Sequence, residues 1–327
     1  GPHLLGLEPQ ERALEGAARA DRRWLVASAP LGASAPPAAA APPGGAARSL
    51  GAAAPTWAKA VYRRSLLTLR ALTDRRTGAV AAGARDGWAY VWPRDAGTAA
   101  LAFAAAGHRA EARRVARFLE RLDLSAAARF HGDGSPVPGR EAQGDAAGWV
   151  AVATRAGGPA RPMGGRSGPP PEARGAARRL AGDSAGTVEA ERPGWRGRPD
   201  YQEKAPGDFL GNAIAATASG DPTRLSAGAI AARFGARGAL VRVAGDPDRG
   251  ADPNADANRD VYSAAAWAVR PFPLPRLHPA ARESLRRLLA AGGRFGIAPS
   301  ADWPETDPWT APTAWAAWAF AALSHEG

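Results

Sequence analysis

The stretch Tyr90-Val91-Trp92-Pro93-Arg94-Asp95 leads directly into an apolar run over residues 96–106. The pattern predicts a helix that begins near Asp95, because an acidic side chain is favourable at a helix N-terminus. The same residues place an aromatic ring, a cation and a carboxylate at the mouth of that helix. Trp92 could stack on a sugar ring while Arg94 and Asp95 hydrogen-bond its hydroxyls. The hexapeptide is therefore either a sugar-binding group or an ordinary helix start with Trp92 as an apolar anchor.

Helical patterns continue on both sides of this hexapeptide. Apolar periodicity and stop signals, such as Gly107 after the run over 96–106, predict helices over residues 10–27, 56–73, 95–106, 109–122, 209–218, 224–234, 260–269, 279–291 and 310–323. No sustained alternation of apolar and polar residues is present, so little β-sheet is expected. The sequence predicts an all-α fold whose loops carry the polar and aromatic clusters.

Two stretches interrupt the helical patterns. Residues 28–55 consist mainly of Ala, Pro, Gly and Ser, which cannot form a core and indicate a linker. Residues 157–199 are rich in Gly, Pro and Arg and are too long for an ordinary loop, which favours a variable insertion. We therefore expect an N-terminal helix and linker over residues 1–55 and one helical domain over residues 56–327.

Composition excludes several classes of protein. The 327 residues are 45% apolar, enough for a large core, and the absence of cysteine rules out disulfides and thiolate metal sites. The net charge of +11 comes almost wholly from arginines spread along the chain, which does not favour a nucleic-acid partner. No apolar run of about 18 residues and no signal pattern appear, so we predict a cytoplasmic protein without a membrane partner.

Cofactor and metal motifs are also missing from the sequence. The five histidines are scattered without ligand spacing, and no P-loop, dinucleotide fingerprint or Gly-x-Ser-x-Gly motif is present. We therefore expect no cofactor. The Asp- and Asn-rich loop over residues 246–258 offers oxygen ligands for Ca²⁺, although turn chemistry explains the same composition without a metal.

Four ordered segments resemble the catalytic domain of glycoside hydrolase family 15. They are residues 65–95, with Trp92-Pro93-Arg94-Asp95; residues 143–149, with Gln143-Gly144-Asp145; residues 199–204, with Tyr201-Gln202-Glu203; and Pro308-Trp309-Thr310 at a helix start. The resemblance spans roughly residues 60–325. The family contains glucoamylases, glucodextranases and some trehalases. The resemblance implies an (α/α)6 toroid-type barrel of helical hairpins. It also implies inverting, exo-acting hydrolysis that releases glucose from the non-reducing end of α-glucosides.

Inverting hydrolysis requires an acid and a base on opposite faces of the sugar, with the carboxyl groups roughly 6.5–9.5 Å apart. The resemblance makes Glu203 the general acid, and the ring of Tyr201 could desolvate Glu203 and raise its pKa. Lys204 directly follows Glu203 where the family often has an acidic residue. The alternative interpretation is therefore a solvated Glu203 paired with Lys204.

The resemblance also assigns substrate contacts. Trp92, Arg94, Asp95, Asp145, Tyr201, Arg294 and Trp309 are the expected sugar-binding residues. Trp149 and Trp303 could form walls of the site or belong to the core, and we expect Trp315 and Trp318 to be core residues on one helical stripe.

The general base has no clear counterpart. In the family it follows the Pro-Trp helix, and this chain ends directly after residues 310–323, so the last helix pair and the base are expected to be missing. Glu305 lies in a Pro-Glu step, but before Trp309, which makes it a weak substitute. We expect impaired activity, with a non-catalytic protein that binds α-glucan or an α-glucoside as the alternative. A helical scaffold that binds protein or nucleic acid has only the basic composition in its favour.

Overall fold

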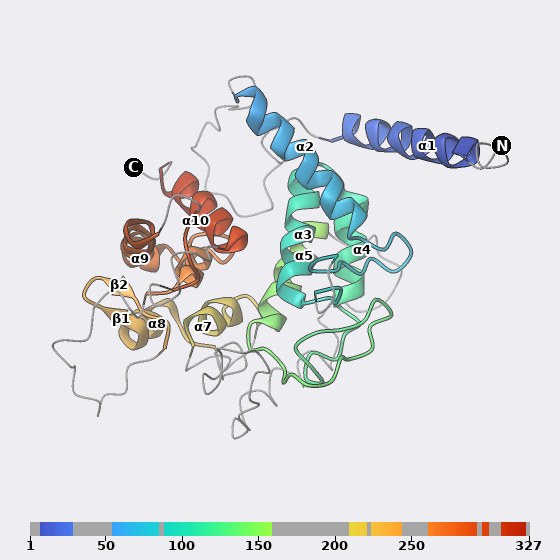
Figure 1. Ribbon diagram of the computed structural model, residues 1–327. Coiled ribbons are helices and arrows are strands. Elements are labelled where there is room, and N and C mark those ends of the chain that lie inside the picture. The colour runs from blue at the N-terminus through green and yellow to red at the C-terminus, as the bar shows by residue number, and fades with distance from the viewer. Residues whose placement is uncertain are drawn as a thin grey trace. The chain divides into compact units, whose positions relative to one another are not determined.

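The computed structural model describes residues 7–28, 54–84, 88–158, 209–220, 224–243, 261–292, 296–300 and 309–324. This part of the chain is mostly helical and contains a single two-stranded hairpin (Figure 1). The predicted all-α class is confirmed. Its elements are α1 (Leu7–Val26), α2 (Thr56–Ala71), α3 (Pro93–Ala105), α4 (Arg109–Leu119), α5 (Ala146–Gly157), α7 (Leu210–Ala216), α8 (Ala227–Phe234), β1 (Gly235–Ala236), β2 (Ala239–Leu240), η2 (Ser263–Ala268), η3 (Pro275–Leu277), α9 (His278–Ala291) and α10 (Thr310–Leu323).

The chain divides into two compact units. The first consists of Gly1–Val91, Asp95–Leu119 and Ala153–Gly165, and the second of Trp92–Arg94, Glu120–Val152 and Arg166–Gly327. The sequence predicted one domain over residues 56–327, arranged as a toroid. That arrangement depends on how the two units are joined, so it stays a prediction.

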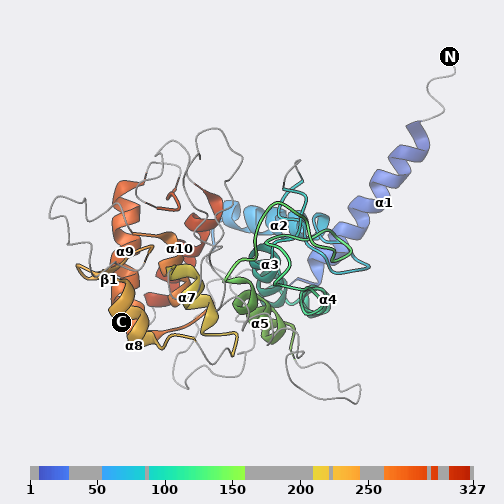
Figure 2. The same ribbon diagram turned by 90° about the horizontal axis from the view of Figure 1, so that it is seen from below.

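In the first unit, Trp24 near the C-terminal end of α1 attaches that helix to α2, α3 and α4. Figure 2 shows the course of these helices. The indole ring stacks on His108, with ring centroids 3.7 Å apart, and its Nε1 donates to Glu111 Oε1 at 3.1 Å. The guanidinium of Arg70 on α2 lies 4.9 Å from the Trp24 ring, and Phe103 of α3 meets the ring edge-on. One aromatic side chain thus joins four helices.

Gly107 ends α3 as the sequence predicts. Its φ of +85° lies in the left-handed region, where glycine has no Cβ penalty. The amide of Gly107 donates to the carbonyl of Ala104, and that of His108 donates to the carbonyl of Phe103. These two bonds form a Schellman motif, which turns the chain sharply into α4.

In the second unit, the short helix η2 lies at the centre of the core. All six of its residues are buried, and α7, α9 and α10 contact it. Trp267 of η2 packs edge-on against Trp149 of α5 and Trp315 of α10, with ring centroids 5.2 and 5.1 Å apart. Phe272 completes the cluster against Trp149. Burial of these large rings removes a large apolar area from water.

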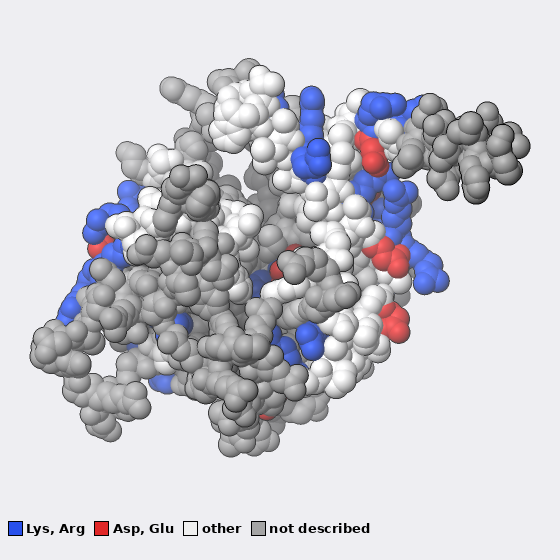
Figure 3. All heavy atoms as spheres, viewed as in Figure 1, with Lys and Arg blue, Asp and Glu red and all other residues white. Residues whose placement is uncertain are grey.

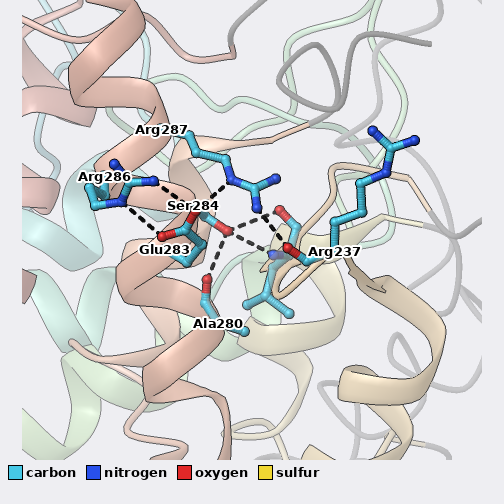
Figure 4. Close-up of polar contacts among 7 residues, drawn as sticks. Arg237, Ala280, Glu283, Ser284, Arg286 and Arg287 are labelled. Carbon is cyan, nitrogen blue, oxygen red and sulfur yellow. Dashed lines mark hydrogen bonds and ion pairs between the residues drawn. The ribbon is translucent and has the colours of Figure 1, made fainter. Parts of the chain in front are cut away.

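The β1–β2 hairpin is fastened to α9 by buried and exposed polar contacts (Figure 4). Ser284 Oγ is fully buried and accepts from the amide of Leu240 at 2.7 Å. Arg287 donates to the carbonyl of Arg237 at 2.6 Å in the turn and to Glu283 on its own helix. Hydrogen bonds from Arg286 and Arg287 lower the pKa of Glu283 to about 2.

Several predicted elements differ from the observed ones. The predicted helix over 260–269 is a 3-10 helix, η2, and α5 was not predicted at all. Residues 146–157 read Ala-Ala-Gly-Trp-Val-Ala-Val-Ala-Thr-Arg-Ala-Gly, an apolar segment with no polar face to give a helical period. Gly148 within it costs helix propensity. Glycine is needed at position 148 because α7 approaches α5 too closely there for a side chain.

Charged side chains are visible over elements of both units on the face that Figure 3 shows, with acidic residues among the basic ones. Within the described ranges, no helix is both long and apolar enough to cross a membrane. The cytoplasmic location stays a prediction.

Candidate active site

Arg94 is the second residue of α3 and the centre of the candidate site. Pro93 at the first helical position presets the backbone for the helix, and Val91 and Trp92 before it are buried. The Arg94 side chain is only 12% exposed. A guanidinium cannot lose its charge in a protein, so its burial requires an acceptor nearby.

Asp145 supplies that acceptor from the loop before α5. Arg94 Nη1 donates to Asp145 Oδ2 at 2.7 Å and to Gln143 Oε1 at 3.3 Å. The Asp145 side chain is 1% exposed, and Gln143 is buried as well. The structure therefore brings together two of the predicted segments, 51 residues apart in sequence. Breaking a buried pair of this kind typically costs about 3–5 kcal/mol.

Trp92 lies beside this pair in the same unit and is itself buried, with 5% of its surface exposed. The guanidinium of Arg129 lies 5.8 Å from the centre of the Trp92 ring, within the range of a cation–π interaction. Arg129 is not among the residues that the sequence patterns predicted for the site. In a chain with so many arginines, no local signal distinguishes this one.

Asp95 differs from its neighbour Arg94 because its side chain is exposed. It occupies the first turn of α3, where a negative charge interacts favourably with the helix dipole. This position suits both of the original interpretations, a helix start and a sugar contact.

The tryptophans divide between core and surface. Trp149 is fully buried in the aromatic cluster around η2 and is a core residue. Trp309, directly before α10, is 36% exposed, and its carbonyl accepts from Thr313 Oγ1 at 2.9 Å. The prediction that Trp318 is a core residue was wrong, because it is 39% exposed. Helix α10 is apolar on all sides, so periodicity could not identify its buried face.

The remaining predicted residues lie outside the described part of the chain. These are Tyr201, Glu203, Arg294, Trp303, Glu305 and the loop over 246–258. Their assigned roles, including acid, base and calcium ligands, stay predictions. Among the described residues, no group of three or more His, Cys, Asp or Glu side chains could hold a metal ion.

Residues 56–130 match the family model described as Glycosyl hydrolases family 15. The matched segment includes Trp92, Arg94 and Asp95 and contains α2, α3 and α4. No curated protein and no solved structure matches the chain. Together, the mostly helical fold of the described residues and this match support a glycoside hydrolase domain. The matched residues 56–130 are similar to glycosyl hydrolases family 15, and the match supports a carbohydrate as the class of substrate.

Proposed function

We propose that this protein is an inverting, exo-acting hydrolase that releases glucose from the non-reducing end of α-glucosides. The observation that carries the proposal is the buried contact of Arg94 with Asp145 and Gln143. Arg94 lies in the segment that matches the family, and Asp145 lies in the second segment that resembles it. An arginine held in this way offers donors of fixed direction, which suits recognition of vicinal hydroxyls.

The proposed roles follow from the chemistry of inversion. Glu203 protonates the leaving oxygen as general acid, and Tyr201 shields it from solvent. Arg94 and Asp95 bind the outer hydroxyls of the terminal glucose, with Trp92, Arg294 and Trp309 as further contacts. Glu305 is the proposed base among the carboxylates of this sequence. Maltose, isomaltose and trehalose all present a terminal α-linked glucose and are the substrates to compare.

The test is the release of glucose from these three disaccharides, followed by NMR at early times. Inversion yields β-glucose first, whereas retention yields α-glucose. Glu203→Gln should lower the rate by about 10²–10⁴-fold because it removes the general acid. Glu141→Gln serves as the matched control, since Glu141 is an exposed carboxylate in the loop before Gln143.

A second function remains open from the sequence, binding of an α-glucoside without cleavage. Disaccharide binding without any glucose release would favour it. Glucose release that is unchanged in Glu203→Gln would contradict the proposed acid, and release of α-glucose first would contradict inversion.

A further inference from the structure

Asp145 is too buried to face a sugar directly in the arrangement that the structure describes. Its side chain is 1% exposed, and its Oδ2 accepts a 2.7 Å charge-assisted bond from Arg94. A carboxylate that binds a sugar hydroxyl must present an oxygen to the ligand. Asp145 instead presents one to a cation of the protein itself, which indicates a different role from that of Arg94.

The geometry of the guanidinium explains what this contact achieves. Nη1 carries two hydrogens, and both Asp145 Oδ2 and Gln143 Oε1 accept from it. Because the guanidinium is planar and rigid, fixing Nη1 between two acceptors also fixes the directions of the Nε and Nη2 hydrogens. A long side chain that is otherwise free to change rotamer loses little further entropy when a ligand binds it.

Hydrogen bonds also hold the backbone around the two acceptors. The amide of Ala146 donates to the carbonyl of Gln143, and the amide of Trp149 donates to the carbonyl of Asp145 at the start of α5. Trp149 is fully buried in the aromatic core. The acceptors of Arg94 thus lie next to a helix that is anchored in the core through Trp149.

We infer that Asp145 and Gln143 are positioning residues, which hold Arg94 in the orientation that recognises one hydroxyl of the terminal sugar. This inference rests on the proposed function, in which Arg94 binds that sugar. It assigns the specificity for the hydroxyl to three residues that act as one group. Of these three, only Arg94 contacts the ligand.

The experiment compares the binding of maltose with that of maltose analogues that each lack one hydroxyl on the non-reducing ring, followed by tryptophan fluorescence. In the unaltered protein, the analogue without the hydroxyl bound by Arg94 should bind about tenfold or more weakly, as expected for a bond to a charged group. Arg94→Ala should abolish this preference. Asp145→Asn, which keeps the shape but removes the charge, should reduce the same preference about tenfold, with little change for the other analogues.

The double variant Arg94→Ala with Asp145→Asn should bind no more weakly than Arg94→Ala alone, because Asp145 acts only through Arg94. Gln143→Ala keeps the ion pair and should reduce the preference by a smaller factor, which provides a test if Asp145→Asn does not fold. Glu141→Gln, in the same loop but exposed, should leave every preference unchanged.

The outcomes separate this inference from the proposed function. If the unaltered protein binds no disaccharide, the proposed function fails and the inference falls with it. If Arg94→Ala loses the preference while folded Asp145→Asn and Gln143→Ala keep it, only the positioning role is overturned. Additive losses in the double variant would make Asp145 a sugar ligand in its own right and would also overturn the inference.

Discussion

Asp95 and Asp145 are both predicted sugar contacts, yet their surroundings are opposite. Asp95 is exposed in the first turn of α3, whereas Asp145 is buried against Arg94. An exposed carboxylate at a helix N-terminus contributes little to stability, while a buried one shares the cost of desolvation with its partner. The two residues should therefore affect stability and binding in different proportions.

We expect Asp145→Ala to lower the free energy of unfolding by about 3–5 kcal/mol, because it leaves the Arg94 charge buried without its carboxylate. Asp95→Ala should lower it by less than about 1 kcal/mol and weaken maltose binding by about tenfold or more. Urea unfolding and sugar titration of both variants check this. Equal losses of stability would show that the difference in burial has no energetic meaning.

His108 links α1 to α4 and should make stability depend on pH. Burial lowers the pKa of His108 below its ordinary value of 6.5; the charge of Glu111 opposes this shift and that of Arg70 reinforces it. Arg70 is itself paired with Asp21 of α1, with 3.1 Å between Arg70 Nη1 and Asp21 Oδ1. The folded protein thus binds fewer protons than the unfolded chain as pH falls below 6.5.

The free energy of unfolding should therefore fall as pH is lowered through 6.5 and level off below the folded-state pKa of His108. Urea unfolding between pH 8 and 5 measures this, as the difference between the unaltered protein and His108→Gln. His131→Gln is the control, because His131 is exposed. A difference that does not change with pH would exclude the linkage.

At the scale of elements, the contact of α5 with α7 depends on the absence of a side chain at Gly148. A Cβ built on Gly148 would lie 2.1 Å from the carbonyl oxygen of Ala215. This oxygen belongs to the backbone of α7, all of whose residues are buried, so the helices would have to separate. Helix α5 begins directly after Asp145, so the packing of α5 is linked to the position of Arg94.

Gly148→Ala should lower the free energy of unfolding by about 1–3 kcal/mol, although alanine favours the helix itself. Gly16→Ala on α1 is the matched control, since a Cβ there meets nothing within 4 Å. The control should be neutral or stabilising by up to about 1 kcal/mol. If both variants behave alike, the close approach of α5 to α7 is incorrect. Chemical unfolding of the two variants decides this.

At the scale of the whole molecule, an aromatic cluster lies in the core of the second unit. Trp267 is fully buried and contacts Trp149, Phe272 and Trp315. Trp267→Ala should lower the free energy of unfolding by about 3–5 kcal/mol, since it combines lost burial with a cavity. Loss of near-ultraviolet circular dichroism from the cluster should accompany the change.

Trp57→Ala provides the control for this prediction. Trp57 lies on α2 and is 70% exposed, so its removal should change stability by no more than about 0.5 kcal/mol. A comparable loss of stability in both variants would mean that Trp57 is covered in solution.

The sequence by itself determined the helical class and most helix positions, whereas the sugar-binding role of the hexapeptide stays a prediction. The predicted bounds of α10 agree with the observed ones, Thr310–Leu323, and Gly107 ends α3. Local patterns suffice here, because helix periodicity and stop signals act between residues a few positions apart.

Only the tertiary structure decided which apolar and polar residues meet. It buried Trp149, exposed Trp318, turned residues 263–268 into a 3-10 helix and joined Arg94 to Asp145 across 51 positions. An apolar helix has no face that sequence alone can choose, and an ion pair between distant segments forms only where packing brings them together. The physical reason is that burial is a property of neighbours in space, which local periodicity does not encode.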